Sequence, residues 1–401
     1  MVNIKNIIKK LLNLAAGVKF PKNSKPSDQN IKSVLVISLY FAGDLLFHSA
    51  VIEMLKKIYP HAEIDLWTRT SSAALLKNDP RINQFIIYDN IKTTDYRNSS
   101  SLDKTEYSNL INDLKKNNYS LVIDLTGKKS TASAVKQINA DFSIGLNYDY
   151  RGYCYDKFVY LNTASEKGHL IDKYLNVIQK GLNINTNEWS KLRSEVKTKP
   201  YIYSDENTAK EVDKLLLNMG LMGREYIAIH LTSGWAAKEL PLNTFSEIIM
   251  NLESTGKAYI FVGDANDKKR VKEIDAMLDM KYDLMKKFAN TDFKRSSEFI
   301  RKASLFIGSD SAPLHIAAAY EIPSIALFGP TNPGFSAPVG HNVKVIYHKL
   351  HCSASEDKQY CTRNGGFTCP LYECMISISS AEIINAVDLL WSKGKVKTAD
   401  E

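Results

Sequence analysis

The chain has 401 residues, of which 44% are hydrophobic and 24% are charged, and its formal net charge is +8. These values are typical of a globular protein with about two domains, and they exclude a disordered, collagen-like or disulfide-scaffold chain. The mild positive surplus suits an anionic ligand or a membrane surface and is too small for a dedicated nucleic-acid-binding protein. Five cysteines in a chain of this length favour a reducing compartment, and no apolar run of about 18 residues is present to span a bilayer.

The first 20 residues form a basic amphipathic segment. In residues 2–20 apolar side chains recur at helical spacing, and lysines lie off that stripe. The interspersed Lys and Asn argue against a signal peptide. Two interpretations stay open: a helix packed on the body of the protein, or a helix lying on an anionic membrane face. Residues 21–30 are then expected to form a linker.

From residue 31 onward, strand and helix patterns alternate. Buried strands are predicted at Val34–Leu39, Glu63–Trp67, Gln84–Tyr88 and Ser120–Leu125, with helices at 44–59 and 106–117. This rhythm predicts a parallel sheet with helices on both faces. Residues 146–205 lose the rhythm apart from a predicted helix at 166–181, and the connection between domains is expected near 185–205.

A second series of the same kind follows. Strands are predicted at Tyr226–Leu231, Ala258–Val262, Ser304–Ile307 and Pro323–Phe328, and helices at Pro241–Glu253 and 379–391. The sequence therefore predicts two doubly wound α/β domains, with a cleft between them and ligands at the carboxyl ends of the strands. The expected parts are 1–30 (N-terminal segment and linker), 31–195 (N-terminal domain), 196–378 (C-terminal domain) and 379–401 (C-terminal helix, packing back across the domains, and tail).

Polar residues follow several of these strands. Asp44 comes just after Gly43 at the start of a predicted helix, where a carboxylate is either a helix cap or a catalytic base aimed into the cleft. Residues 308–319 run from a strand end through a turn into a helix. The N–H groups at such a helix start suit a phosphate, and His315 falls in its first turn.

Two further loops could hold phosphate oxygens. Residues 232–238 offer hydroxyls, backbone N–H groups and the point charge of Lys238, although most lysines are only solvated. Residues 329–331 offer a backbone turn and one hydroxyl. An acid in residues 263–267 could accept from ribose hydroxyls. The chain has no G-x-G-x-x-G after its first strand and no P-loop sequence, which weakens a nicotinamide-dependent or P-loop function. It also has no Asp-x-Asp, so phosphate charge must be met by Lys238, helix dipoles and backbone N–H groups.

Four of the five cysteines are close in sequence. Zinc is bound tetrahedrally by four thiolates, but the spacings contain no C-x-x-C pair, which is a poor zinc pattern. Metal, disulfide and free-thiol interpretations stay open, with free or buried thiols as the default and no metal expected in the catalytic site. The four residues are Cys352, Cys361, Cys369 and Cys374.

Four motifs occur in order along the chain. They are S-L-x-x-x-G-D-L-L-x-x-S-A over 38–50, K-E-L-P over 238–241, D-S-A-P-L-H-I-A-A-A over 310–319 and A-L-F-G-P-T over 326–331. In this order they resemble glycosyltransferase family 9, the ADP-heptose:lipopolysaccharide heptosyltransferases, from about residue 33 to residue 391. The resemblance implies a GT-B fold of two Rossmann-like doubly wound domains facing a central cleft, with the acceptor in the N-terminal domain and the nucleotide sugar in the C-terminal one.

The resemblance also implies an activity. It is inverting, metal-independent sugar transfer without a cofactor, most directly of heptose from ADP-heptose to a lipopolysaccharide core or related surface glycan. The implied location is the cytoplasm, at the inner face of the cytoplasmic membrane, and no nucleic-acid partner is expected. Two alternatives stay open: a family member with another nucleotide sugar or acceptor, and a nucleotide-sugar-binding protein without turnover.

Site residues follow from the same resemblance. Asp44 falls on the general-base position, Lys238 on the diphosphate-binding lysine and Asp267 on an acidic contact to ribose. Further donor-binding residues are expected in the same loops: Thr232, Ser233, Asp310, Ser311, Ala312, His315, Gly329 and Thr331.

This chain also departs from the family pattern at three positions. Ser38 stands where members usually carry Arg or Lys, Ala312 where they commonly have Gly, and Ala50 where they commonly have Pro. Loss of the basic residue removes a contact expected for the acceptor or a phosphate, and Ala312 adds a methyl group where the backbone approaches a phosphate. These departures leave the donor and acceptor more open than the fold.

Overall fold

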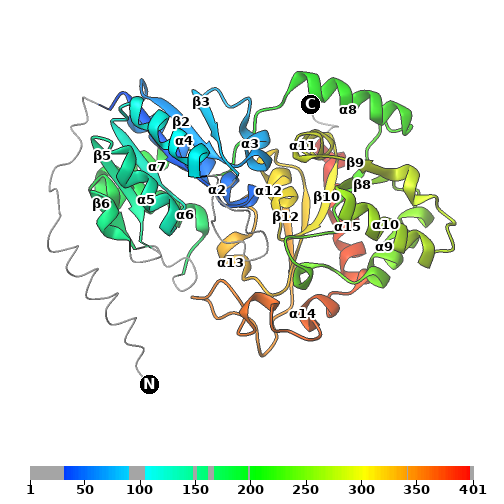
Figure 1. Cartoon of the computed structure of the whole chain (residues 1–401). Coiled ribbons are helices and arrows are strands. Elements are labelled where there is room, and N and C mark those ends of the chain that lie inside the picture. Colours follow the sequence, from blue (N-terminus) through cyan, green and yellow to red (C-terminus); the bar gives the residue numbers. More distant parts are fainter. Residues whose placement is uncertain are drawn as a thin grey trace. The chain divides into compact units, whose positions relative to one another are not determined.

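The protein was analysed as a computed structural model, which describes residues 31–89, 104–147, 151–160, 167–196, 199–340 and 342–397. The chain divides into two compact units (Figure 1). The N-terminal unit comprises residues 1–163 and 170–198, and the C-terminal unit comprises residues 164–169 and 199–401. The predicted helix at 2–20 and linker at 21–30 lie outside the described residues.

The N-terminal unit is built on a six-stranded parallel sheet with the order β3-β2-β1-β4-β5-β6. The strands are β1 (Ser33–Ile37), β2 (Glu63–Thr68), β3 (Gln84–Ile87), β4 (Leu121–Asp124), β5 (Phe142–Leu146) and β6 (Lys157–Val159). The helices are α2 (Ala42–Ile58), α3 (Thr70–Leu76), α4 (Lys104–Lys116), α5 (Lys129–Ile138), η1 (Gly152–Cys154), α6 (Leu170–Gly181) and α7 (Thr186–Glu195).

Both faces of this sheet are buried, which explains the continuous apolar runs in its central strands. Val34 and Val36 pack in one core with residues of α2 and α6. Leu35 and Ile37 point to the opposite face and pack in a second core with residues of α4 and α5. Because successive side chains of a strand alternate between faces, a strand buried on both sides needs apolar residues at every position.

The C-terminal unit repeats the architecture with the sheet order β12-β11-β10-β7-β8-β9. Its strands are β7 (Ile227–Ile229), β8 (Tyr259–Gly263), β9 (Phe288–Asn290), β10 (Leu305–Ser309), β11 (Ser324–Phe328) and β12 (Val343–Tyr347). Its helices are α8 (Glu206–Asn218), η2 (Ala236–Lys238), α9 (Leu242–Ser254), α10 (Ala265–Met277), η3 (Leu284–Lys287), α11 (Phe293–Arg301), α12 (Ala312–Ala319), α13 (Pro333–Ser336), η4 (Asn364–Gly366), α14 (Glu373–Ile376) and α15 (Ser380–Lys397).

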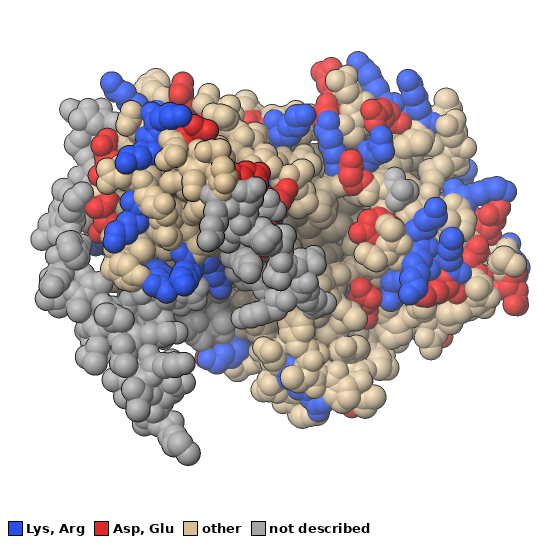
Figure 2. Space-filling view, viewed as in Figure 1, with Lys and Arg blue, Asp and Glu red and all other residues tan. Residues whose placement is uncertain are grey.

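Helices cover this second sheet as well. Ile227 and Ile229 share a core with α9, α10 and α15, while α12 packs on β10 and β11 and against α11. On the face shown in Figure 2, lysine, arginine and acidic side chains are interspersed over the C-terminal unit, so the positive surplus forms no single patch there. Of the helices in the described part of the chain, none combines the length and the apolar character needed to cross a bilayer.

The predicted strand–helix alternation is confirmed, and it continues past residue 146, where the sequence pattern predicted its loss: β6 extends the first sheet beyond β5. The two units divide between residues 198 and 199, inside the connection expected near 185–205, and that connection also contains α7, which the sequence pattern did not predict. The sequence of α7 is mostly polar, and the helix is anchored by the buried Trp189 and begun by Asn185, whose side chain accepts from the Glu188 N–H. One buried residue in a helix produces no apolar stripe, so the pattern gave no signal.

Candidate functional site

The polar loops of the C-terminal unit meet at one edge of its sheet. Lys238 closes η2 after β7, Asp310 follows β10, and Thr331 follows β11. Because these three parallel strands are neighbours in the order β11-β10-β7, their carboxyl ends lie side by side. Residues up to 93 positions apart in the chain (238 to 331) are thereby brought into one cluster, as the loop positions predicted.

The centre of this cluster is a buried ion pair. The Lys238 ammonium donates to the Asp310 carboxylate at 2.7 Å and to the Asp310 backbone carbonyl at 3.0 Å. The two side chains are only 11% and 7% exposed. The ammonium also lies 4.1 Å from the centre of the Trp235 ring, where a cation is attracted by the ring face. Two of its three N–H bonds serve Asp310, which leaves one for a ligand oxygen.

Further groups hold the Asp310 carboxylate in place. Thr331 donates its hydroxyl to Oδ2 at 2.8 Å, Ser336 donates to Oδ1 at 3.3 Å, and Nε2 of His315 lies 3.6 Å from Oδ1. Burial alone would raise the pKa of this carboxyl, but the charges and hydrogen bonds of Lys238 and His315 hold it well below the usual range. Asp310 is therefore ionised at neutral pH and fixes the position of Lys238.

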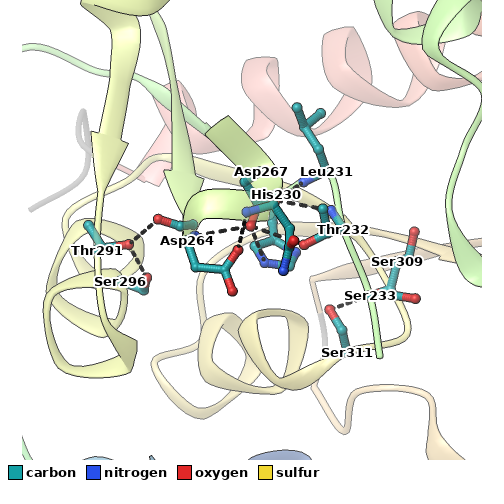
Figure 3. A network of polar contacts seen from close by, with 12 residues as sticks. His230, Leu231, Thr232, Ser233, Asp264, Asp267, Thr291, Ser296, Ser309 and Ser311 are labelled. Carbon is teal, nitrogen blue, oxygen red and sulfur yellow. Dashed lines mark hydrogen bonds and ion pairs between the residues drawn. The ribbon is translucent and has the colours of Figure 1, made fainter. Parts of the chain in front are cut away.

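A helix N-terminus adjoins this pair. Ser311 is the N-cap of α12 and Pro313 lies in its first turn. The Ser311 hydroxyl donates backward to the Ser309 carbonyl at 3.2 Å and does not cap the helix (Figure 3). Ala312, the first residue of α12, is half-buried. The partial positive charge of the helix start, about half an elementary charge, thus lies next to the neutralised Lys238–Asp310 pair.

Asp267 lies at the same edge of the sheet and has a structural role there. Its buried carboxylate accepts from the backbone N–H groups of Leu231, Thr232 and Asp264, each at 3.1 Å, and from the Thr232 hydroxyl at 3.0 Å (Figure 3). Nε2 of His230 lies 3.6 Å away. These bonds tie the start of the loop after β7 to the start of α10. Contact of Asp267 with a ribose remains a prediction.

Replacing Asp267 by Asn is expected to destabilise the folded chain by about 1–3 kcal/mol, because an amide cannot accept from donors on both sides. Thermal unfolding measured beside the donor KM distinguishes the two roles. A lower midpoint is the expected result, and a raised donor KM with an unchanged midpoint would instead support the ribose contact. Asp283→Asn, at a half-exposed carboxylate, is the matched control.

Ser233 lies in the loop after β7 that also carries Lys238, and Gly329 lies in the turn after β11. The Ser233 hydroxyl donates to the Trp235 carbonyl at 2.7 Å, and its backbone N–H donates to Glu239 at 3.2 Å. A side chain at Gly329 would meet Sδ of Met375 at 2.5 Å, so this turn has no room for one. Direct contact of either residue with a donor remains a prediction.

In the N-terminal unit, Asp44 lies in the first turn of α2 and is half-buried. The cap interpretation of Asp44 is wrong, because α2 begins two residues earlier and Phe41 is its N-cap. One helical turn after Asp44, on the same helix face, the buried His48 shares a 2.7 Å hydrogen bond between its Nδ1 and the Ser38 hydroxyl. Ser38, at the position where a basic residue was expected from the family resemblance, is thus part of a buried neutral pair.

His48 also makes the stability of the chain dependent on pH. Burial lowers its pKa from 6.5 to about 3, so between these values only the unfolded chain binds the proton. Stability is therefore retained above pH 6.5 and lost as pH falls toward 3, by about 3 kcal/mol at pH 4. We expect His48→Gln to flatten this dependence in urea unfolding at pH 7 and pH 4.5. The exposed His61, changed to Gln, is the control and should leave the slope unchanged.

Some residues of these clusters were not singled out from the sequence. Trp235 stacks on Phe367 with ring centres 5.3 Å apart and supports the Lys238 ammonium. Ser336 reaches Asp310 from α13, and His48 reaches Ser38. Of these three residues, Trp235 alone could have been found from the sequence, because it lies three residues before a lysine in a loop that follows a predicted strand.

Comparison of the sequence with known proteins identifies the family of this chain. A model of glycosyltransferase family 9 (heptosyltransferase) matches residues 107–364, more than half of the chain. The chain is 28% identical over 352 residues to lipopolysaccharide heptosyltransferase 3 of Escherichia coli, covering 87% of this chain and 96% of that protein.

Two solved structures share the fold. E. coli ADP-heptose LPS heptosyltransferase II has a TM-score of 0.72 at 19% identity, over 90% of this chain and 99% of that one. E. coli heptosyltransferase WaaC with ADP has a TM-score of 0.64 at 16% identity, over 89% and 99%. The expected GT-B fold class is confirmed by these likenesses and by the two six-stranded parallel sheets. The chain belongs to glycosyltransferase family 9, the heptosyltransferase family, and is a glycosyltransferase.

Proposed function

We propose that this glycosyltransferase transfers heptose from ADP-heptose to a lipopolysaccharide core or a related surface glycan, with inversion and without a divalent ion on the donor diphosphate. The names of its relatives support the donor and acceptor classes: one is a lipopolysaccharide heptosyltransferase, and one fold relative is described with ADP. The observation that carries the proposal is the Lys238 ammonium, fixed by Asp310 beside the start of α12.

The C-terminal unit supplies the donor half of the reaction. As the anomeric carbon–oxygen bond breaks, negative charge develops on the departing diphosphate. Because Asp310 neutralises Lys238, the pair carries little net charge, but Lys238 can still donate one oriented N–H to a phosphate oxygen. The N-terminus of α12 adds a partial positive charge beside that donor. Both groups are held in place before the reaction, which is the condition under which fixed dipoles lower a barrier most.

The N-terminal unit supplies the acceptor half. Asp44 accepts the proton of the acceptor hydroxyl as that oxygen attacks the anomeric carbon. Attack from the face opposite the departing diphosphate inverts the anomeric configuration. The proton passes to Asp44, the new glycosidic bond forms, and ADP leaves with the electrons of the broken bond.

A donor screen tests this proposal. Thermal shifts with ADP-heptose, ADP-glucose, UDP-N-acetylglucosamine and GDP-mannose should show the largest stabilisation for ADP-heptose. Transfer to a heptose-deficient lipopolysaccharide core should proceed in EDTA and give the inverted linkage by NMR. A larger shift with another nucleotide sugar would contradict the donor, and transfer only with added Mg²⁺ would contradict the role given to Lys238.

We further propose that residues 2–20, which lie outside the described residues, bind the anionic inner face of the cytoplasmic membrane. Their lysines lie off an apolar stripe, a composition that suits anionic lipid. Flotation with phosphatidylglycerol vesicles should retain the full chain and release the chain lacking residues 1–30. Equal retention of both chains, or equal binding to neutral phosphatidylcholine vesicles, would contradict this role.

A further inference from the structure

Four cysteines converge on one small cavity in the C-terminal unit. Together they line a cavity of about 10 Å³, into which Arg363 and Glu373 also reach. A cavity of that size holds roughly one water molecule or one ion. The cysteines come from separate parts of the segment after β12, and the cavity gathers them all: Cys352, Cys361, Cys369 and Cys374.

Because one small cavity is lined by all four thiols, they lie close together. All four are free thiols in the structure.

Backbone hydrogen bonds hold the loops that carry these cysteines, and one of these bonds goes to a cysteine sulfur. The Tyr372 N–H donates to Sγ of Cys369 at 3.3 Å, a bond that orients a thiol and favours its deprotonated form. The Cys361 N–H donates to the Pro330 carbonyl and the Thr362 N–H donates to the Cys352 carbonyl, each at 2.9 Å. The loops that carry the thiols are thus held by hydrogen bonds to defined positions.

The segment has little regular structure of its own. Between β12 and α15 the chain forms only the short helices η4 and α14 and a single bridge between Tyr360 and Thr331. Loops of such length with so little secondary structure are uncommon unless a function or a crosslink holds them. A metal ion bound by side chains from distant points supplies such a crosslink.

We propose that Cys352, Cys361, Cys369 and Cys374 bind one thiophilic divalent cation, Zn²⁺ or Fe²⁺, as four thiolates. Tetrahedral coordination by four sulfurs is the geometry these two ions share. Among the described residues, no group of three or more His, Cys, Asp or Glu side chains is already arranged to hold a metal. The four thiols must therefore move closer together to act as ligands, and each loses its proton to solvent on binding.

This site is structural and is linked to the donor loops. The Cβ of a residue at Gly329 would lie 3.0 Å from Sγ of Cys374, so that turn packs on the cluster. The Gly365 carbonyl, in the same segment, accepts from the Trp235 indole N–H at 2.9 Å. The metal thereby holds the segment that supports Trp235 and, through it, Lys238. The inference does not depend on the identity of the donor.

Metal analysis of the purified full-length chain tests the site. We expect about one zinc or iron per chain by plasma mass spectrometry, unchanged in Cys154→Ser and at least tenfold lower in Cys374→Ser and Cys361→Ser. Cys154, which lies in the N-terminal unit and does not line the cavity, is the matched control. Less than a tenth of an equivalent of metal in the wild-type chain would overturn the proposal.

A spectroscopic test needs no variant and covers the case in which the variants fail to fold. Metal-depleted wild-type chain titrated with Co²⁺ should develop sulfur-to-cobalt charge-transfer bands and tetrahedral d–d bands that saturate at one equivalent. Absence of these bands would count against four-thiolate ligation. Two disulfides among the four cysteines in a non-reducing digest of freshly purified protein would likewise overturn it.

Discussion

Asp44→Asn is expected to reduce the turnover of sugar transfer by about 10²–10⁴-fold, because Asn cannot accept the proton of the acceptor hydroxyl. The change preserves the size of the side chain in the first turn of α2, where Asp44 is half-buried. Donor affinity should remain within about threefold of wild type, since the donor contacts are assigned to the C-terminal unit. Steady-state transfer kinetics and donor binding by calorimetry provide the two measurements.

The control for this variant removes a carboxylate that has no assigned role. Asp113 lies on the exposed face of α4, paired with Lys116, and Asp113→Asn should transfer sugar at the wild-type rate. Turnover near the wild-type value in Asp44→Asn would refute its role as the base. Loss of donor binding together with turnover would point to a disturbed fold, which the thermal midpoint would reveal.

Lys238→Met is expected to lower kcat/KM by about 10²–10³-fold through loss of the oriented donor to the diphosphate. It should also destabilise the chain by about 3–5 kcal/mol, because the buried Asp310 carboxylate would lose its charged partner. Met keeps the length and apolar stem of the side chain over Trp235. Transfer kinetics and chemical unfolding measure the two effects independently.

The double variant Lys238→Met/Asp310→Asn distinguishes the effect of Lys238 on stability from its effect on catalysis. It removes both charges of the pair, so most of the lost stability should return while kcat/KM stays low. Recovery of both stability and transfer would show that Lys238 only neutralises Asp310. Full activity in Lys238→Met alone would exclude any role of the ammonium in catalysis.

The local features of the site were predictable from the sequence. Asp44, Lys238, Asp310 and Thr331 were each identified in a loop or helix start that follows a predicted strand, and the carboxyl ends of parallel strands share one edge of a sheet. The roles given to Asp44 and Lys238 came from the family resemblance. Pro313 in the first turn of α12 follows from the local preferences of helix starts. These features depend on a few neighbouring residues, which is why pattern and spacing were sufficient.

The partners within the site were not predictable in this way. Lys238 and Asp310 are 72 positions apart, and nothing in either segment indicates that they form a buried pair. The edge strand β12 was missed for a related reason: it is only partly buried and lacks a continuous apolar run. Contacts between distant segments depend on packing, which leaves no periodic signal in the sequence.

By itself, the sequence determined that this protein has two parallel α/β halves, which polar loops end their strands, and which family its motifs resemble. Burial of both sheet faces requires apolar residues at successive strand positions, and such runs can be recognised in the sequence alone. Only the tertiary structure decided that Asp310 fixes Lys238, that His48 is a buried neutral partner of Ser38, and that four cysteines share one cavity. These contacts join residues that are far apart in the sequence. They form only when the folded chain packs those residues together and excludes water from between them.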